Sequence, residues 1–263
     1  MLCKRWNKRI QKIFTAVLVI VLAGCFILTD AHGETINLTA ERQTVIDALS
    51  DFQQSVPEIQ RIHVSFHEYA SVVRIPAFYD STVDQATTLF SSLRQYRMDK
   101  LILDLRDCPG GVIKAAIALA GLVVPEGEIC TVLRYRDGML DTAPEYMKIY
   151  KSTLTEPFFK ITVLTNAYTA SSAELLTAAI QESGVGIVIG SRTYGKSTIQ
   201  KVNMLDNGEM KAVTVGRYLT RNRIDIEGQG LTPDIFMESG KGGQCIEAAS
   251  AWLSKGFYKI YLS

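Results

Sequence analysis

Apolar and polar positions along the chain follow two periods, one of about two residues and one of about 3.6 residues. The first is typical of strands and the second of helices, and the two alternate through the middle of the sequence. Strand patterns occupy 62–67, 72–78, 100–106, 129–136, 161–165 and 185–189, and helix patterns occupy 82–96, 112–124 and the segment from 171. This order predicts an α/β fold around one core sheet.

Three further elements flank this alternation. They are a helix within 34–60 that stops at Pro57, a β-hairpin over 198–219 with its turn at 206–208, and a C-terminal helix over 244–253. The hairpin is predicted by two alternating segments on either side of an Asp-Asn-Gly turn. The stretch 137–157 has too little pattern for an assignment.

The N-terminus has a different composition from the rest of the chain. Cationic residues fall within 4–12, and an uncharged apolar run of about 17 residues follows, close to the lower limit for a membrane-spanning helix. Leu22-Ala23-Gly24-Cys25 resembles a lipoprotein box, in which Cys25 would be lipidated. A lipoprotein, an uncleaved anchor and a cleaved export signal all remain open, and each places the body of the chain outside the cytoplasm.

We therefore divide the chain into a signal or anchor segment (1–33), a short extension of helix and strand (34–71) and a core domain (72–263). The 263 residues are 47% hydrophobic, which is enough for one sizeable core. The net charge of +1 and the scattered basic residues argue against nucleic acid as a partner.

No metal or other cofactor is expected. His63 and His67 are four residues apart on a predicted strand, about 13 Å along it, which is too far for them to share an ion. Three cysteines of the body, Cys108, Cys130 and Cys245, have no C-x-x-C spacing. Buried thiols are the favoured reading, and one disulfide is the alternative.

Ser171 is the candidate nucleophile, because it follows a strand and opens a helix whose free N–H groups can stabilise an oxyanion. The three histidines all precede this region, so Lys196 is the more economical base. An ammonium must lose its own proton before it can act as a base, which requires burial of the amine.

Two other readings compete with this hypothesis. Ser171 and Glu174 have the spacing of a capping box, which is compatible with a nucleophile at the same place. Residues 190–197 match the phosphate-binding pattern G-x4-G-K-[ST], but that loop requires a helix at the lysine. Since the sequence continues with a strand pattern, nucleotide binding is disfavoured.

Four motifs taken together resemble the C-terminal-processing, or tail-specific, serine peptidases. They are LILDLRDCPGG at 101–111, TASSAE at 169–174, RTYGK at 192–196 and GQGLTPD at 228–234. The resemblance implies a single core of the crotonase/ClpP-like ββα-spiral type, finished by the hairpin and the C-terminal helix. It also implies a protein or peptide as substrate and no cofactor.

The same resemblance assigns roles to individual residues. Ser171 would be the nucleophile, Lys196 the general base and Gln200 the group that orients the lysine. The oxyanion hole would use backbone N–H groups of Gly110 or Gly111 and of Ser172, and the supporting residues would be Glu174, Thr193 and Glu182.

The sequence also departs from the family pattern. Cys108 replaces an asparagine, Tyr168 and Thr169 replace small residues, and Glu182 stands for an aspartate. About 40 residues lie between the signal and the core, whereas a peptide-binding PDZ domain needs roughly 80 to 100. We therefore expect either an ungated cleft or a separate protein that delivers the substrate.

The sequence thus predicts an extracytoplasmic, membrane-associated serine endopeptidase that works through an acyl-enzyme. A catalytically inactive peptide-binding protein with the same fold is the main alternative. A third reading is a Ser-Lys hydrolase that acts on a non-peptide ester or amide.

Overall fold

The computed structural model describes residues 20–22, 25–29, 35–68, 70–136, 139–140, 143–204, 208–238 and 242–254. The chain divides into two compact units, Met1–Asp51 and Phe52–Ser263. Elements of the first are β1 (Ile20–Leu22), β2 (Cys25–Thr29), β3 (Thr35–Asn37) and most of α2 (Leu38–Gln53). The three strands form an antiparallel sheet.

The export segment expected at 1–33 lies partly outside the described residues, and Cys25 begins β2. In the part of the chain that the structure describes, no helix is both long enough and apolar enough to cross a bilayer.

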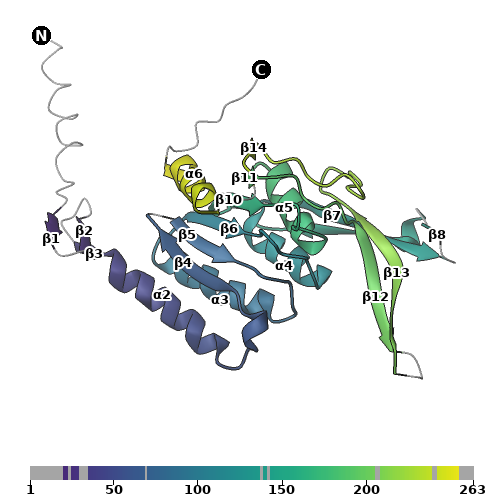
Figure 1. The fold of residues 1–263 in the computed structure, drawn as a ribbon, viewed down its shortest axis with the longest axis horizontal. Helices are drawn as coiled ribbons and strands as arrows, with labels where there is room; N and C mark the ends of the chain where they lie inside the picture. Colours follow the sequence, from purple (N-terminus) through teal and green to yellow (C-terminus); the bar gives the residue numbers. More distant parts are fainter. Residues whose placement is uncertain are drawn as a thin grey trace, which may run out of the picture. The chain divides into compact units, whose positions relative to one another are not determined.

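The second unit is built on a six-stranded sheet with the order β14-β11-β10-β6-β5-β4 (Figure 1). Neighbouring strands are parallel except for β4 and β5, which form an antiparallel hairpin. The strands are β4 (His63–His67), β5 (Ala70–Arg74), β6 (Lys100–Asp104), β10 (Lys160–Thr165), β11 (Gly186–Gly190) and β14 (Ile235–Phe236). The strand expected ahead of the core is therefore an edge strand of the core sheet.

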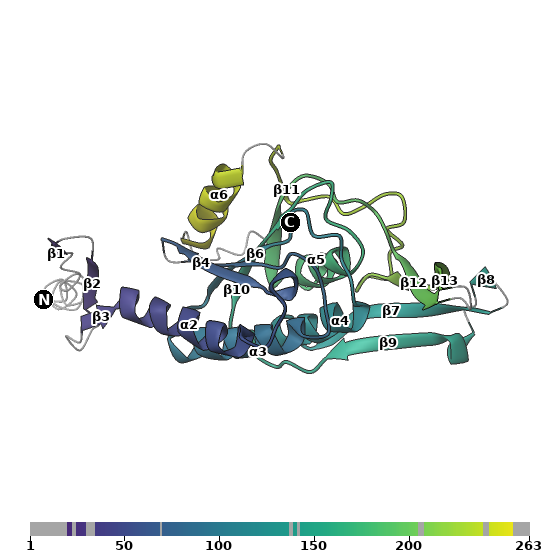
Figure 2. The same cartoon turned by 60° about the horizontal axis from the view of Figure 1, so that its bottom comes forward.

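Helices cover both faces of this sheet, which explains the continuous apolar runs of its central strands. On one face, α6 (Gly242–Ser254) packs its Ala249 against strand residues that include Ile102 and Leu164. The other helices are α3 (Thr82–Gln95), α4 (Ile113–Val123), α5 (Ser172–Glu182) and the short 3-10 helix η1 (Glu58–Gln60). Figure 2 shows α6 on one side of the sheet and α3 and α4 on the other.

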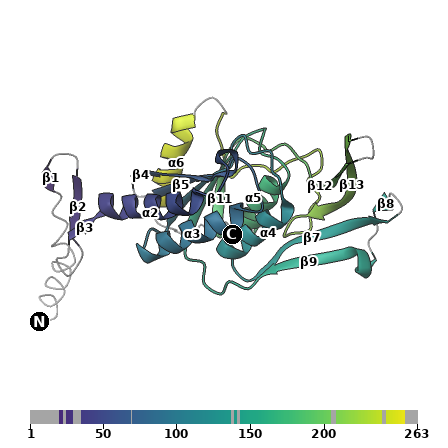
Figure 3. The same cartoon turned by 90° about the horizontal axis from the view of Figure 1, so that it is seen from below.

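A second sheet has the strand order β12-β13-β7-β8, with β9 also paired to β7. Its elements are β7 (Gly127–Arg136), β8 (Met139–Leu140), β9 (Met147–Ser152), β12 (Thr198–Met204) and β13 (Met210–Leu219), with η2 (Pro144–Tyr146) before β9. Figure 3 shows the pairs β7/β9 and β12/β13 extending away from the six-stranded sheet. In this order β12 is an edge strand.

The predicted α/β fold, its C-terminal hairpin and its C-terminal helix are confirmed. Three details differ. The helix predicted within 34–60 is shorter, β5 ends at Arg74 ahead of Pro76, and the stretch left unassigned contains β9. No helix begins at Lys196, because the chain is irregular until β12 starts at Thr198.

Candidate active site

Three loops meet at the carboxyl ends of β6, β10 and β11. These parallel strands end at the same edge of the sheet, so the loops that follow them converge. The Ala170 N–H donates to the Cys108 carbonyl, and the Tyr194 N–H donates to the Thr169 carbonyl, each at 3.0 Å. Three motifs that are far apart in the sequence are thereby joined in space.

Ser171 is the N-cap residue of α5, with φ 56° and ψ −119°. A positive φ is strained for a residue that has a Cβ atom, and such strain persists only where the surrounding structure holds it. The half-buried side chain lines a cavity of about 750 Å³. Gly111, Ser172, Lys196 and Gln200 line the same cavity, so the three catalytic candidates and two of the three oxyanion-hole candidates lie together.

The buried carboxylate of Glu174 connects the serine loop to the lysine loop. Its Oε2 accepts the N–H groups of Ser171 and Lys196, both at 2.8 Å. Its Oε1 accepts the Thr193 hydroxyl and, at 2.7 Å, the Gly195 N–H. The first of these contacts is the carboxylate half of the predicted capping box. One oxygen atom therefore fixes the backbones of both Ser171 and Lys196.

Lys196 extends its amine along the start of β12. Its Nζ donates to Oε1 of Gln200 at 3.0 Å. The lysine is half-buried, not fully buried, because the cavity beside it is open. On the far side of Lys196, Oε2 of Glu227 accepts the N–H groups of Ser197 at 2.7 Å and of Thr198 at 3.1 Å. Two carboxylates thus hold four consecutive backbone N–H groups around the lysine.

Tyr218 lies beneath the serine and is 1% exposed. Its hydroxyl donates to the Ser171 carbonyl at 2.9 Å, and the Lys196 carbonyl is 3.4 Å from it. Burial, with the Glu174 carboxylate as the next cause, raises the pKa of Tyr218 well above its ordinary value. The phenol therefore remains a donor across the physiological pH range and adds a second link between the two loops.

The two glycines of the diglycine loop have different surroundings. Gly111 lines the cavity, and its carbonyl accepts the Ser172 hydroxyl at 2.9 Å. The Gly110 N–H is hydrogen-bonded to the thiol of Cys108. Burial raises the pKa of Cys108 to about 11, and this hydrogen bond offsets part of the effect. Cys108 is therefore a neutral thiol behind the loop, and of the two glycines Gly111 is the one beside the cavity.

The sequence model of peptidase family S41 matches residues 70–237, which include all four motifs. The chain belongs to peptidase family S41. Carboxy-terminal processing protease CtpA of Bacillus subtilis is 33% identical over 167 residues, covering 63% of this chain and 34% of that protein. The chloroplastic C-terminal processing peptidase of Tetradesmus obliquus is 32% identical over 210 residues, covering 79% of this chain and 44% of that protein. This S41 chain thus spans less than half the length of either relative.

Solved structures agree with this S41 assignment. The photosystem II D1 C-terminal processing protease has a TM-score of 0.54 and 31% identity, with 64% of this chain and 42% of that chain covered. A lipoprotein from Streptococcus agalactiae has a TM-score of 0.60 at 18% identity, with 82% of this chain and 74% of that chain covered. At this identity the likeness shows the fold alone. The predicted peptidase core of the ClpP-like type is consistent with these neighbours.

Two supporting residues of the S41 resemblance have distinct positions. Thr193 donates to Glu174 and accepts the Leu231 N–H at 2.7 Å, so it belongs to the same network as the serine and the lysine. Glu182 accepts the Thr220 hydroxyl at 2.8 Å and the Asn222 N–H at 2.7 Å. It lies at the other end of α5 and holds the loop that follows β13.

Sequence reasoning missed three residues that hold the S41 site together: Tyr218, Glu227 and Asn166. The Asn166 Oδ1 accepts the Asp107 N–H and its own loop's Tyr168 N–H, each at 3.0 Å. An asparagine directly after a strand is a common turn former, so the sequence did indicate a turn at Asn166. Tyr218 falls on the inward positions of an alternating strand, where a tyrosine hydroxyl needs a partner. Glu227 had no local signal.

The diglycine loop of this S41 chain leads to a first test, the substitution Gly110→Ala. The new Cβ would lie 2.7 Å from the Ala170 carbonyl oxygen and 2.8 Å from the Ser171 Cβ, at a φ of +93°. We expect the unfolding free energy to fall by about 1–3 kcal/mol, and the displaced serine to lose at least about tenfold in kcat/KM. Thermal unfolding and peptide hydrolysis measure the two effects.

Gly121→Ala is the matched control, because it places the same methyl group in α4 with no atom within 4 Å. It should stabilise the chain by up to about 1 kcal/mol and leave hydrolysis unchanged. Full activity in Gly110→Ala would contradict the close approach of this loop to Ser171.

Proposed function

We propose that this S41 chain is a serine endopeptidase that cleaves proteins or peptides through an acyl-enzyme. Ser171 is the nucleophile and Lys196 the general base. The observation that carries the proposal is that both residues line one cavity while the same oxygen of Glu174 holds both backbones. The relatives named above are carboxy-terminal processing peptidases, which supports the same reaction class.

In the first step, Oγ of Ser171 attacks the scissile carbonyl carbon while its proton passes to the uncharged amine of Lys196. The Gln200 Oε1, 3.0 Å from Nζ, keeps the amine directed along the cavity wall. The N–H groups of Gly111 and Ser172 then receive the oxyanion at the mouth of α5. The protonated lysine gives its proton to the leaving amine, and water later cleaves the ester by the reverse sequence of proton transfers.

The half-buried position of Lys196 gives the substrate a role in its own cleavage. A neutral amine is favoured where water is excluded, and the open cavity excludes water only in part. A peptide lying along the cavity excludes more of this water from the amine. This supports a preference for extended, flexible segments, which fit the cavity more readily than folded ones.

We also propose that the reaction takes place outside the cytoplasm, with the chain held at the membrane through its N-terminus. The support is the cationic segment at 4–12, the apolar run after it and the lipoprotein-like residues that end at Cys25. We propose in addition that a separate protein delivers the substrate to the chain.

The test is to treat the full chain with a fluorophosphonate probe and to assay it with casein and a peptide library. We expect one probe molecule per chain, located at Ser171 by tandem mass spectrometry, and loss of hydrolysis in proportion to labelling. Labelling with ester hydrolysis but no peptide cleavage would indicate a non-peptide hydrolase. An unlabelled, inactive chain that still binds peptides would indicate a binding protein.

A further inference from the structure

The hairpin of β12 and β13 has one face that carries no charge. β7 pairs with β13 only from Gly216 to Leu219, so the outer part of the hairpin is held by its own two strands (Figure 3). Side chains of opposed residues share a face, and the face alternates along each strand. The face that begins with Gln200 and its partner Thr214 therefore also holds Val202, Met204, Met210 and Ala212. We call these six positions the uncharged face.

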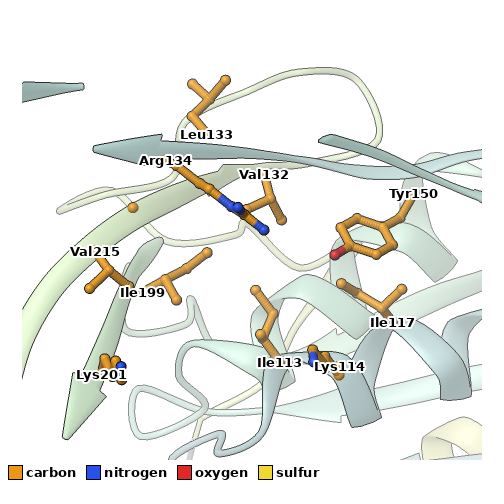
Figure 4. A pocket seen from close by; sticks show the side chains of 11 residues that line it. Ile113, Lys114, Ile117, Val132, Leu133, Arg134, Tyr150, Ile199, Lys201 and Val215 are labelled. Atoms are coloured by element: carbon orange, nitrogen blue, oxygen red, sulfur yellow. The ribbon is translucent and has the colours of Figure 1, made fainter. Parts of the chain in front are cut away.

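The uncharged face continues one wall of the cavity that contains Ser171. Gln200 and Val202 belong to both surfaces. The opposite face of the hairpin leads to a different place, because Lys201 and Val215 line a neighbouring cavity of about 260 Å³ between the hairpin, β7 and α4 (Figure 4). A peptide that leaves the Ser171 cavity along β12 can therefore pass directly onto the uncharged face.

Most of the uncharged face is apolar and exposed. Val202 is 55% exposed, Met204 75% and Met210 68%. Since β12 is also an edge strand, the hairpin offers a ready site for pairing with another chain. The two methionines oppose each other, and their unbranched side chains adapt to apolar partners of different shapes. The face is thus suited to a variable apolar ligand.

We infer that the uncharged face binds an extended apolar segment of the substrate, while the adjoining residues of that segment occupy the Ser171 cavity. The continuity of the two surfaces favours the substrate as the occupant. A second copy of the chain is disfavoured, because on this face it would cover Val202 and so part of the cavity itself. Charged substrate residues are disfavoured as well, since they would lose water here without gaining a partner.

This inference rests on the proposed function and narrows its substrate class to flexible chains with an uncharged, apolar stretch beside the cleaved bond. An extended peptide rises by about 3.3 Å per residue, as β12 does, so Val202 and Met204 are about 7 Å apart along the strand. The apolar stretch therefore begins within about two residues of the part that fills the cavity.

The test compares internally quenched peptides that share one cleaved core sequence and have both ends blocked, so that chain termini contribute nothing. A flank of four residues is placed on one side of the core or on the other, and it consists either of valine and leucine or of serine and threonine. For the full chain we expect the apolar flank to lower KM by about tenfold on one side of the core. The two kcat values should be similar, because the flank does not touch the reacting bond.

The double variant Met204→Gln with Met210→Gln should raise the KM of the apolar-flanked peptide to that of the polar-flanked one. Both side chains are exposed, so folding should be retained, and thermal unfolding checks this. Val213→Thr is the matched control. It exchanges an apolar group for a polar one of the same shape on the opposite face of the hairpin, where Val213 pairs with Lys201, and the preference should persist.

Equal KM values for the two kinds of flank in the wild type, on both sides of the core, would overturn the inference and leave the proposed function intact. A preference that survives in the double variant would overturn it too, since other residues would then bind the flank. A wild-type dimer that dissociates in the double variant, measured by sedimentation velocity, would show that a second copy covers the face instead.

If no peptide is cut, the proposed function fails by itself. Fluorescence anisotropy with the uncut peptides then still decides the inference. It requires the wild type to bind the apolar-flanked peptide more tightly than the polar-flanked one, and the double variant to lose this difference.

Discussion

Replacing Ser171 with alanine should abolish peptide hydrolysis, with a fall in kcat/KM of at least about 10⁴-fold. The adjacent Ser172 does not substitute, because it donates its hydroxyl to the Gly111 carbonyl. The change removes one oxygen atom from the cavity wall and keeps the backbone N–H that Glu174 accepts. The capping-box contact of the Ser171 side chain with the Glu174 N–H is lost, so the unfolding free energy should fall by about 0.5–2 kcal/mol. The rate is therefore measured at a temperature where the variant is fully folded, so that its loss is chemical.

Ser183→Ala provides the matched control at the other end of α5. Its hydroxyl donates to the Ile180 carbonyl and does not line the cavity that contains Ser171. Wild-type kinetics are expected from it. Hydrolysis by Ser171→Ala at a rate close to that of the wild type, after removal of contaminating peptidases, would show that another group is the nucleophile.

The predictable parts of this molecule are those whose signals are local. The strand patterns at 100–106 and 161–165 predict strands of one core sheet, and the buried, parallel pair β6 and β10 confirms it. The spacing of Ser171 and Glu174 predicts the carboxylate contact at the start of α5. Gly110 has no room for a Cβ atom beside Ala170 and Ser171, so the structure requires a glycine where this loop approaches the serine.

The parts that could not be predicted depend on long-range partners or on weak patterns. Glu227 binds Ser197 and Thr198 only because the chain returns some thirty residues later. Five of the six residues of β9 are half-exposed or exposed, so the strand lacks the alternation of buried and exposed positions that identifies a strand. The degree of burial of Lys196 depends on the open shape of the cavity, which no local sequence feature determines.

Replacing Glu174 with glutamine should destabilise the chain and inactivate it together. A glutamine has one accepting oxygen and one donating NH₂ group. If the NH₂ replaces Oε2, it faces the N–H groups of Ser171 and Lys196; if it replaces Oε1, it faces the Gly195 N–H. A backbone N–H cannot become an acceptor, so either orientation leaves at least one buried donor unpaired.

Each such donor costs about 1–3 kcal/mol, and we expect the unfolding free energy to fall by about 2–4 kcal/mol. The activity should fall by more than the loss of unfolding free energy alone would cause. Ser171 and Lys196 lose the common oxygen that fixes their separation, and a displacement of about 1 Å is enough to lower kcat about 10²-fold. Denaturant titration and single-turnover kinetics, at a temperature where the variant is fully folded, measure the two effects separately.

Glu182→Gln on the same helix is the matched comparison. One of its two partners is the Thr220 hydroxyl, which can rotate to accept from the new NH₂ group, while the carbonyl oxygen keeps the Asn222 N–H. The expected cost is below about 1 kcal/mol, with kcat close to that of the wild type. If Glu174→Gln were as active and as stable as Glu182→Gln, the buried carboxylate would not be what aligns the serine with the lysine. The alignment would then have to come from the Tyr218 hydroxyl and the loop contacts alone.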